Sequence, residues 1–90
     1  MESKSVLVEI ITPKEMFYSG QAEMMIVSTI NGQEGFMAGH TWCCKLLSDQ
    51  GNVRVREDGQ KDFKTARIKG GGYVDIKDHF VVYTDEAEWA

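Results

Sequence analysis

The sequence predicts an all-β fold, a small sandwich of two mainly antiparallel sheets with about eight to ten short strands. Short runs rich in β-branched and aromatic residues recur along the chain, each bounded by turn-forming residues. No window of ten or more residues places apolar residues at i, i+3, i+4 and i+7, so a long amphipathic helix is not expected. The chain has 90 residues with 42% hydrophobic content, which suits one small domain spanning residues 1–90.

Eight runs are predicted to be strands, and the sole proline, Pro13, falls between the first two, where it interrupts no ladder. Close spacing of many short strands is typical of a sandwich or a small barrel. The runs are Val6–Ile11, Phe17–Ser19, Glu23–Ser28, Trp42–Leu47, Val53–Arg56, Phe63–Ile68, Tyr73–Lys77 and Phe80–Tyr83.

A hairpin is predicted near Asp58-Gly59, and two registers compete for it. Turn chemistry alone favours a two-residue loop at this pair, which would place Arg56 opposite Lys61. A three-residue loop would place Arg56 opposite Asp62, a favourable pair of opposite charges. We therefore expect the three-residue loop.

The C-terminal residues carry a helix-start signal. Asp85 is a favoured capping residue, and Glu88 follows three positions later. We therefore predict that a helix begins here and is cut off within residues 85–90.

Composition excludes several classes of function. The net charge of −4 argues against general nucleic-acid binding, which needs clustered Lys and Arg. No run of about 18 apolar residues and no signal peptide is visible, so a cytoplasmic location is expected. Between residues 54 and 69, six Lys and Arg stand against three Asp and Glu. This stretch is either a solvated strand face, the favoured interpretation, or a docking patch.

The candidate chemical groups do not form a catalytic or metal site. Cys43 and Cys44 are adjacent, which suits no disulfide, and at least one is expected to be a small buried hydrophobe. With His40 they form a single His-x-x-Cys cluster, whereas a closed zinc site needs four ligands. No nucleophile, base and orienting acid are linked by spacing. We expect no catalytic residues, no metal and no cofactor.

The run Gly70-Gly71-Gly72 is not predicted to bind phosphate. No Lys-Ser or Lys-Thr and no helix follows it, as a P-loop requires. A bulge or a close crossing at a strand start is expected instead.

The segment Gly32–His40 is the most informative stretch, because its three glycines imply turns or close approaches of the backbone. Phe36 and Met37 are residue types enriched at interfaces, and we expect Phe36 to face the core and Met37 to face outward. The predicted loop-shaping residues are Gly32, Gly35, Gly39, Gly70, Gly71 and Gly72. The predicted partner-interface residues are Gln33, Glu34, Met37 and His40.

Together these motifs resemble the N-terminal β-sandwich domain of the epsilon subunit of the rotary F-type ATP synthase. Six family features occur in order across residues 6–88, including Thr12-Pro13, Tyr18-Ser19-Gly20, Gly32–His40, Ile68–Tyr73 and Phe80–Glu88. The chain departs from the family pattern at Ala38 and Trp42, where relatives carry proline, and at Gln33, where many carry glutamate. Each lost proline can cost about 0.4–1 kcal/mol and loosen the loop.

The resemblance implies a non-catalytic central-stalk subunit that docks on the gamma subunit and on the polar loops of the c-ring. Such a subunit couples proton translocation to ATP synthesis. It lies peripherally on the cytoplasmic side of the cell membrane, attached only through the complex, and is expected to be monomeric in isolation. By position, Gln33, Glu34 and His40 match the rotor-contacting segment. Restraint of ATP hydrolysis by C-terminal helices is not expected of these 90 residues, whether the chain is truncated or naturally short.

Two other classes of function stay open. One is a free-standing β-sandwich adaptor, which the departures at Ala38 and Trp42 favour. The other is a small metal-binding β enzyme, for which the single His and Cys cluster is the only signal.

Overall fold

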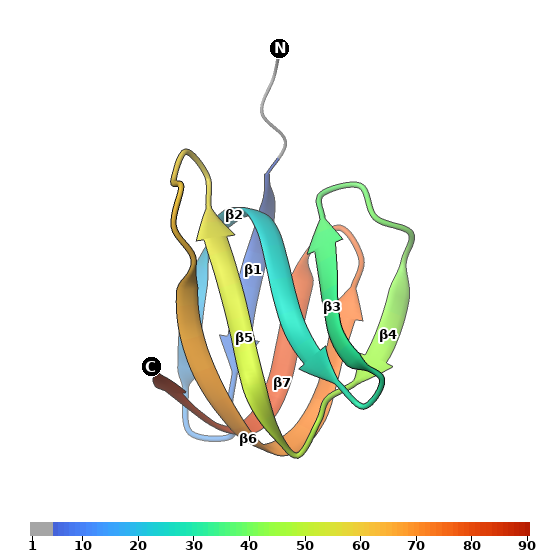
Figure 1. The fold of residues 1–90 in the computed structure, drawn as a ribbon, viewed down its shortest axis with the longest axis vertical. Helices are drawn as coiled ribbons and strands as arrows, with labels where there is room; N and C mark the ends of the chain where they lie inside the picture. Colours follow the sequence, from blue (N-terminus) through green and yellow to red (C-terminus); the bar gives the residue numbers. More distant parts are fainter. Residues whose placement is uncertain (1–4) are drawn as a thin grey trace.

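The computed structural model describes residues 5–90, and among them it contains seven strands and no helix (Figure 1). The strands are β1 (Val6–Ile11), β2 (Met16–Thr29), β3 (Gly32–Met37), β4 (Cys43–Leu46), β5 (Gln50–Glu57), β6 (Lys64–Ile76) and β7 (Phe80–Trp89). The predicted all-β fold is therefore confirmed. Within these residues, no helix is long and apolar enough to cross a membrane.

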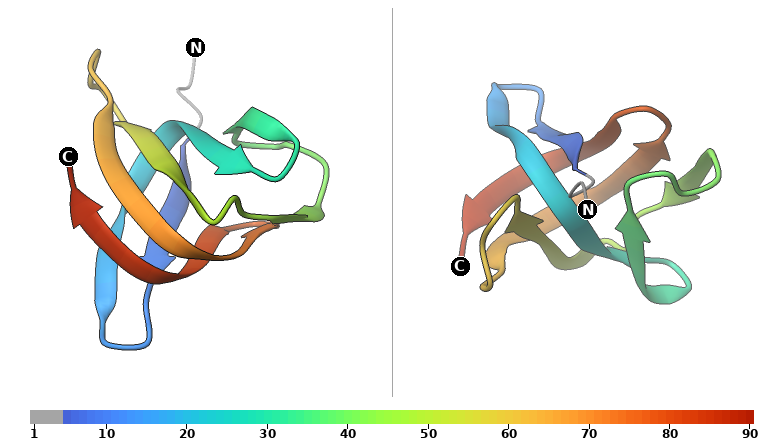
Figure 2. Two further views of the ribbon diagram at one scale, coloured as in Figure 1. Left: turned by 60° about the horizontal axis from the view of Figure 1, so that its bottom comes forward. Right: turned by 90° about the horizontal axis from the view of Figure 1, so that it is seen from above.

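Five of the strands close on themselves to give a barrel-like sandwich. Their order is β1-β7-β6-β5-β2, and β2 pairs again with β1. Among the strands of residues 5–90, only β1 and β7 pair in parallel. β3 extends the sheet from β2, and β4 extends it from β6, so both lie on one side of the body (Figure 2). Closure leaves few free edges and makes a stiff body.

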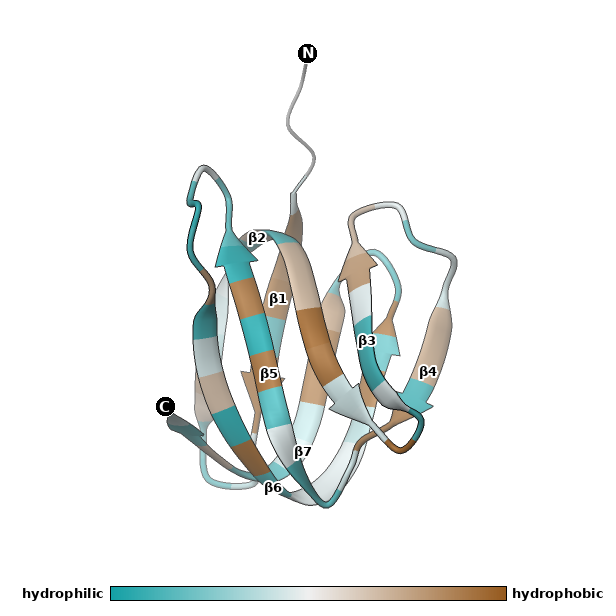
Figure 3. Ribbon diagram, viewed as in Figure 1, coloured by the Kyte–Doolittle hydropathy of each residue, from teal (hydrophilic) through white to brown (hydrophobic). Residues whose placement is uncertain are grey.

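The core lies inside this closed body and follows from alternation along each strand. In β1, Val6, Val8 and Ile10 are buried, whereas the residues between them are partly exposed. Figure 3 shows the same alternation of apolar and polar residues along β5. The rings of Phe36 and Phe80, the largest fully buried side chains, lie 6.3 Å apart. Period-two burial of this kind is what sheet geometry requires.

The structure has seven strands because two pairs of the eight predicted runs merge, which leaves six, and β3 forms where no strand was predicted. β2 covers the runs at 17–19 and 23–28, and β6 covers most of the runs at 63–68 and 73–77. Each long strand contains a register shift, between Ala22 and Met24 in β2 and between Lys69 and Gly72 in β6. A bulge bends a strand without ending it. Each long strand can therefore curve around the core.

The bulge predicted at the glycine run is confirmed, although it lies inside β6 and not at a strand start. Gly70 and Gly71 together face one residue of β7, Asp85. All three glycines have φ values, 96°, 72° and 117°, that favour glycine. A Cβ on Gly72 would overlap the carbonyl oxygen of Tyr83. The run therefore permits both the bulge and the close approach of β7.

The helix predicted to begin at Asp85 is wrong, because these residues belong to β7. Glu86 faces Lys69, and Glu88 faces Arg67, across the β6–β7 ladder. At the strand end, the Trp89 ring lies 4.9 Å from the Phe17 ring. Cross-strand pairing outweighs the local capping signal, which is a weak preference.

The hairpin register that we expected is also wrong, because the loop is longer. β5 ends at Glu57 and β6 begins at Lys64, and Arg54 faces Thr65 in the ladder. The Arg54 guanidinium lies 4.7 Å from the centroid of the Phe63 ring, which stays outside the ladder. The Lys64 ammonium lies 3.4 Å from the Glu57 carboxylate. These two contacts stabilise the longer loop. The prediction of the register compared only residues that face one another across the two strands, so it did not consider them.

Candidate functional site

Most of the glycine-rich segment is a strand, not a loop. Residues 32–37 form β3, which runs antiparallel to β2 from Gly32 opposite Thr29 to Met37 opposite Met24. The turn before it is short, and the Thr29 hydroxyl accepts a hydrogen bond from the Asn31 amide at 3.1 Å. The loop proper covers only residues 38–42 and leads into β4. All six residues from Gly32 to Met37 are therefore held by pairing with β2, a strand of the closed body.

The predicted interface residues of β3 fall on two different faces. Gln33 and Met37 point outward and are exposed, whereas Glu34 and Phe36 point inward. Phe36 is 2% exposed and Met37 is 55% exposed, so the prediction for this pair is confirmed. Strand geometry explains the split, because successive side chains alternate between faces.

The outer face of β3 and β2 carries an apolar strip. Met37 lies opposite Met24, and the next outward pair is Gly35 opposite Ile26. A Cβ on Gly35 would lie 3.0 Å from the terminal methyl group of Met24, so a larger residue would displace that side chain. We name this surface, made by Gln33, Met37, Met24 and Ile26, the β3 face.

Two arginines border the β3 face, and both have partners within the chain. In the β2–β5 ladder, Met24 faces Arg56 and Ile26 faces Arg54. The Arg56 guanidinium donates a hydrogen bond of 3.0 Å to the Glu23 carboxylate. Arg54 lies over the Phe63 ring, as described above. These internal contacts favour the interpretation of the basic stretch as part of a strand face.

Glu34 points inward and links β3 to β4. The Thr29 hydroxyl donates a hydrogen bond of 2.7 Å to its carboxylate, and the Lys45 ammonium lies 3.5 Å away. The Thr29 hydrogen bond, followed by the charge of Lys45, lowers the pKa of Glu34. The geometry gives this residue a structural role in addition to any contact with a partner.

His40 is folded back onto β3. Its backbone amide donates a hydrogen bond of 3.1 Å to the Met37 carbonyl, and its ring meets the Phe36 ring edge-on at 4.9 Å. Nδ1 lies 2.8 Å from the Thr41 carbonyl oxygen, which requires a proton on that nitrogen. The imidazole is therefore exposed at its other edge but fixed in position.

The two cysteines lie on β4 and face opposite sides. Cys43 is partly buried against the core, and Cys44 is exposed. Among residues 5–90, no three His, Cys, Asp or Glu side chains are grouped so that they could hold a metal ion.

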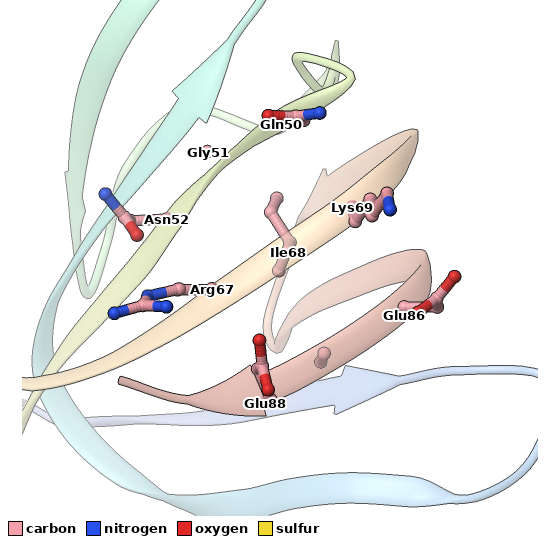
Figure 4. A pocket seen from close by; sticks show the side chains of 9 residues that line it. Gln50, Gly51, Asn52, Arg67, Ile68, Lys69, Glu86 and Glu88 are labelled. Atoms are coloured by element: carbon pink, nitrogen blue, oxygen red, sulfur yellow. The ribbon is translucent and has the colours of Figure 1, made fainter.

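A polar hollow lies away from these residues, on β5, β6 and β7 (Figure 4). Its charged side chains are Arg67 and Lys69 on β6 and Glu86 and Glu88 on β7, which face one another across the ladder. Amides from β5, Gln50 and Asn52, complete its polar lining. Alternating charges of this kind are typical of a solvated sheet face.

Sequence reasoning missed Lys45, Met24 and Ile26. Met24 and Ile26 could have been found from the register of β3 on β2, which places them beside the outward residues of β3. Lys45 could not be found in this way, because β4 pairs with β6 and reaches Glu34 only through the side chain.

Comparison with known proteins connects this arrangement to a family. The chain matches the family "ATP synthase, Delta/Epsilon chain, beta-sandwich domain" over residues 5–90. It is 33% identical to the ATP synthase epsilon chain of Caldanaerobacter subterraneus subsp. tengcongensis, covering 96% of this chain and 61% of that protein. It is 37% identical to the ATP synthase epsilon chain of Alkaliphilus oremlandii, covering 90% and 58% respectively. The chain thus spans about three fifths of the length of these relatives.

Two solved structures share the fold. A chain in the Euglena gracilis mitochondrial ATP synthase, in an assembly of OSCP, F1 and c-ring, superposes with a TM-score of 0.84 at 22% identity. That alignment covers 94% of this chain and 53% of the other. A chain in the central stalk and c-ring structure of the Tetrahymena thermophila enzyme superposes with a TM-score of 0.73 at 12% identity, covering 98% and 69%. From the family match and the epsilon-chain relatives, this chain belongs to the ATP synthase delta/epsilon β-sandwich family.

Proposed function

We propose that this chain is a non-catalytic part of the central stalk of a rotary F-type ATP synthase. It docks on the gamma subunit and on the c-ring and couples proton translocation to ATP synthesis. The family match and the epsilon-chain relatives support this proposal. Within the complex the chain lies on the cytoplasmic side of the membrane as a peripheral component, and alone it is a monomer.

The observation that carries the proposal is the β3 face on a closed, stiff body. Met37 is 55% exposed and Gln33 is exposed, although both belong to a strand held by a full ladder. A rotor component must transmit torque without deforming, and a closed sheet with a packed core suits that demand. Exposed apolar and amide groups on a rigid strand are suited to partner contact at low entropic cost.

The four predicted interface residues take different parts in this proposal. Gln33 and Met37 contact the partner directly. His40 offers the free edge of its imidazole from the adjoining loop, where Phe36 and Thr41 fix its ring. Glu34 acts as a positioning residue, because its ion pair with Lys45 holds β3 against β4.

The proposal is tested by titrating the purified chain with the gamma subunit and, separately, with the detergent-solubilised c-ring of its own organism. The variants are Gln33→Lys and Met37→Ser. Gln60→Lys is the matched control, because Gln60 is exposed at the tip of the β5–β6 loop. We expect the wild-type chain to bind, each β3-face variant to bind at least about tenfold more weakly, which is about 1.4 kcal/mol, and the control to bind normally.

Absence of binding to both subunits would overturn the central-stalk proposal. Binding that neither variant changes would retain the central-stalk role but would overturn the assignment of the β3 face.

A second candidate, a free-standing adaptor, is favoured by one observation. Trp42 replaces a proline of the family pattern and is 63% exposed in the loop beside His40. A large exposed aromatic is typical of a changed partner surface. If the chain binds neither subunit, and its gene lies outside an ATP synthase operon, the adaptor function is the better account.

A further inference from the structure

An asparagine followed by a glycine lies at the tip of the turn between β2 and β3 (Figure 1). Asn31 and Gly32 are both exposed, and Gly32 has a φ of 106°. The other asparagine of the chain, Asn52, lies within β5 and is followed by the β-branched residue Val53. The turn therefore holds the one Asn-Gly sequence of the chain.

An Asn-Gly sequence has an intrinsic chemical reactivity. The backbone nitrogen of the glycine attacks the side-chain amide carbon, Cγ, of the asparagine. A new C–N bond closes a succinimide ring, the nitrogen gives up its proton, and ammonia leaves. Water then opens the ring at either carbonyl and leaves aspartate or isoaspartate, whose backbone runs through the former side-chain carbon. Glycine favours the attack because it has no Cβ to hinder the approach.

The fold leaves room for this attack. Nothing lies within 4 Å of the position that a Cβ would take on Gly32. The side chain of Asn31 makes no hydrogen bond within residues 5–90, although its backbone amide donates one of 3.1 Å to the Thr29 hydroxyl. Gly32 is also the terminal residue of the β2–β3 ladder, where pairs open most readily. The Asn31 side chain is therefore free to turn toward the Gly32 nitrogen.

The residues just before the pair are fixed to the body. Thr29 is 4% exposed, and the Ile30 amide donates a hydrogen bond of 3.0 Å to the Leu46 carbonyl of β4. The tip of the turn can therefore change its conformation while the strand that leads into it stays in place.

A second sequence can close the same ring, but the structure restrains it. In Asp58-Gly59 the leaving molecule would be water, and the product would be isoaspartate. The Gly59 amide, which would attack, donates a hydrogen bond of 2.9 Å to the Glu23 carboxylate. The Arg56 guanidinium holds that carboxylate with a hydrogen bond of 3.0 Å. The attacking nitrogen is thus bound to an anion on another strand, and the chain provides its own comparison for Asn31-Gly32.

We propose that Asn31-Gly32 is a site of spontaneous deamidation and that the product loosens β3. Either product adds a negative charge to the turn, three residues before Glu34. Isoaspartate also adds one carbon atom to the backbone between residues 31 and 32. The Thr29 hydroxyl oxygen lies 3.1 Å from the Asn31 nitrogen and 2.9 Å from the Gly32 carbonyl oxygen. A longer backbone between these two atoms cannot keep both contacts.

The consequence for β3 follows from its position after the turn. Turn length and turn type set the register of a hairpin. A longer turn therefore disturbs the pairing of Gln33 and the residues after it with β2. This inference goes beyond the proposed function, because it concerns a covalent modification of the chain and requires no partner.

Peptide mapping by mass spectrometry tests the reaction in the whole chain. The chain is incubated in mildly alkaline and in mildly acidic buffer. We expect the Asn31 peptide to convert faster in the alkaline buffer, where the glycine nitrogen loses its proton more readily. There it should convert at least about tenfold faster than the Asn52 peptide. Methylation by protein isoaspartyl methyltransferase identifies the isoaspartate product. Equal conversion at the two asparagines would overturn the proposal.

A synthetic peptide with the sequence of residues 28–34 gives the rate without the fold. We expect Asn31 in the chain to react within about tenfold of this rate, because the turn leaves the pair free. Asn31 that stays intact in the folded chain while the peptide reacts would overturn the proposal.

Two variants test the structural argument. Gly32→Ala should slow the reaction, because its methyl group hinders the attack, and thermal unfolding checks the fold at this positive φ. Glu23→Ala removes the acceptor of the Gly59 amide and should increase isoaspartate at Asp58. The rate at Asn31 should not change in Glu23→Ala, which excludes general unfolding as the cause. No increase at Asp58 would contradict the explanation of its protection.

Hydrogen exchange measures the effect of the product on β3. The isoaspartate form is separated by ion-exchange chromatography, and its amide exchange is compared with that of the unmodified chain. We expect faster exchange in β3 and unchanged exchange in β1 and β7. Asn31→Asp, which adds the charge without the extra backbone atom, should give a smaller increase. Identical β3 exchange in the isoaspartate form would overturn the proposed loosening. None of these measurements uses another subunit, so their failure is distinct from failure of the central-stalk proposal.

Discussion

The carboxylate of Glu34 lies 3.5 Å from the ammonium nitrogen of Lys45, and this ion pair joins β3 to β4. Each of these strands has its backbone ladder elsewhere, β3 on β2 and β4 on β6. The ion pair therefore connects two strands, β3 and β4, that no backbone ladder joins. Inward-pointing charges at sheet edges also discourage pairing with other chains. One side chain thus links the strand of the candidate interface to β4.

Replacing Glu34 with Gln should loosen this side of the body. The neutral amide loses the attraction to Lys45, so amide hydrogens of β3 and β4 should exchange faster with solvent. Those of β1 and β7 should not change. Hydrogen exchange read by NMR measures this, with Glu15→Gln in the exposed turn as the control. Unchanged exchange in β3 and β4 would show that the ion pair has no positioning role.

Gly72→Ala should destabilise the fold strongly, by more than about 3 kcal/mol, because a methyl group there overlaps the backbone of Tyr83. Gly39 is the matched control. It also has a positive φ, 85°, but has open space around its Cβ position, so Gly39→Ala should cost only about 1–2 kcal/mol. Urea unfolding measures both. Equal losses would mean that φ, and not the close crossing, explains the need for glycine at residue 72.

Tyr18→Phe should cost about 1–2 kcal/mol of stability, because the Tyr18 hydroxyl donates a 2.6 Å hydrogen bond to Glu57. Burial, followed by this hydrogen bond, raises the pKa of Tyr18 above its ordinary value of about 10. The stabilisation is therefore full below pH about 10 and is lost as the pH rises toward the folded-state pKa. Urea unfolding and an ultraviolet absorbance titration measure the two effects. Tyr83→Phe, at an exposed ring, is the control.

Stability should fall as the pH is lowered below about 4.5. Hydrogen bonds lower the pKa values of Glu23, Glu34 and Glu57, the first from the Gly59 amide, the second from the Thr29 hydroxyl and the third from the Tyr18 hydroxyl. A lowered folded-state pKa stabilises the fold above the unfolded-state value and loses that effect as the pH falls through the folded-state value.

Urea unfolding over a series of pH values measures this dependence. Glu34→Gln should give a shallower fall than wild type, because one titrating group is removed. A wild-type curve that stays flat as the pH is lowered from 6 through the ordinary pKa range of glutamate would contradict the role of these carboxylates.

The predictable part of the fold was the part governed by local alternation. Every second residue of Val6–Ile11 and Phe80–Tyr83 lies inside, as the alternation of a strand requires. The glycine run at residues 70–72 also indicated its bulge, because few other residues tolerate those φ values.

Long-range pairing decided the features that sequence analysis got wrong. The capping signal at Asp85 is local, whereas the ladder that makes β7 needs Lys69 and Arg67, both on β6. The segment Gly32–Met37 has three polar or flexible residues at its start and no strand signal, yet β2 supplies a full set of partners. Local propensity is a weak preference that such tertiary contacts override.

For the candidate site, the sequence identified the right segment but not the direction of each side chain. The inward position of Glu34 follows from the β3 register, and its partner Lys45 lies on a strand that pairs elsewhere. The neighbourhood of Leu46, Tyr73 and Tyr83 was hidden for the same reason, since these residues come together only through two ladders.

The most direct test of the central-stalk account is ATP-driven proton pumping by an ATP synthase depleted of its epsilon subunit and supplied with this chain. The account predicts that the wild-type chain restores pumping relative to ATP hydrolysis, that Met37→Ser restores less, and that Gln60→Lys restores as much as wild type. Pumping that stays at the depleted level with the wild-type chain, although the depleted enzyme responds to full-length epsilon, would contradict the account.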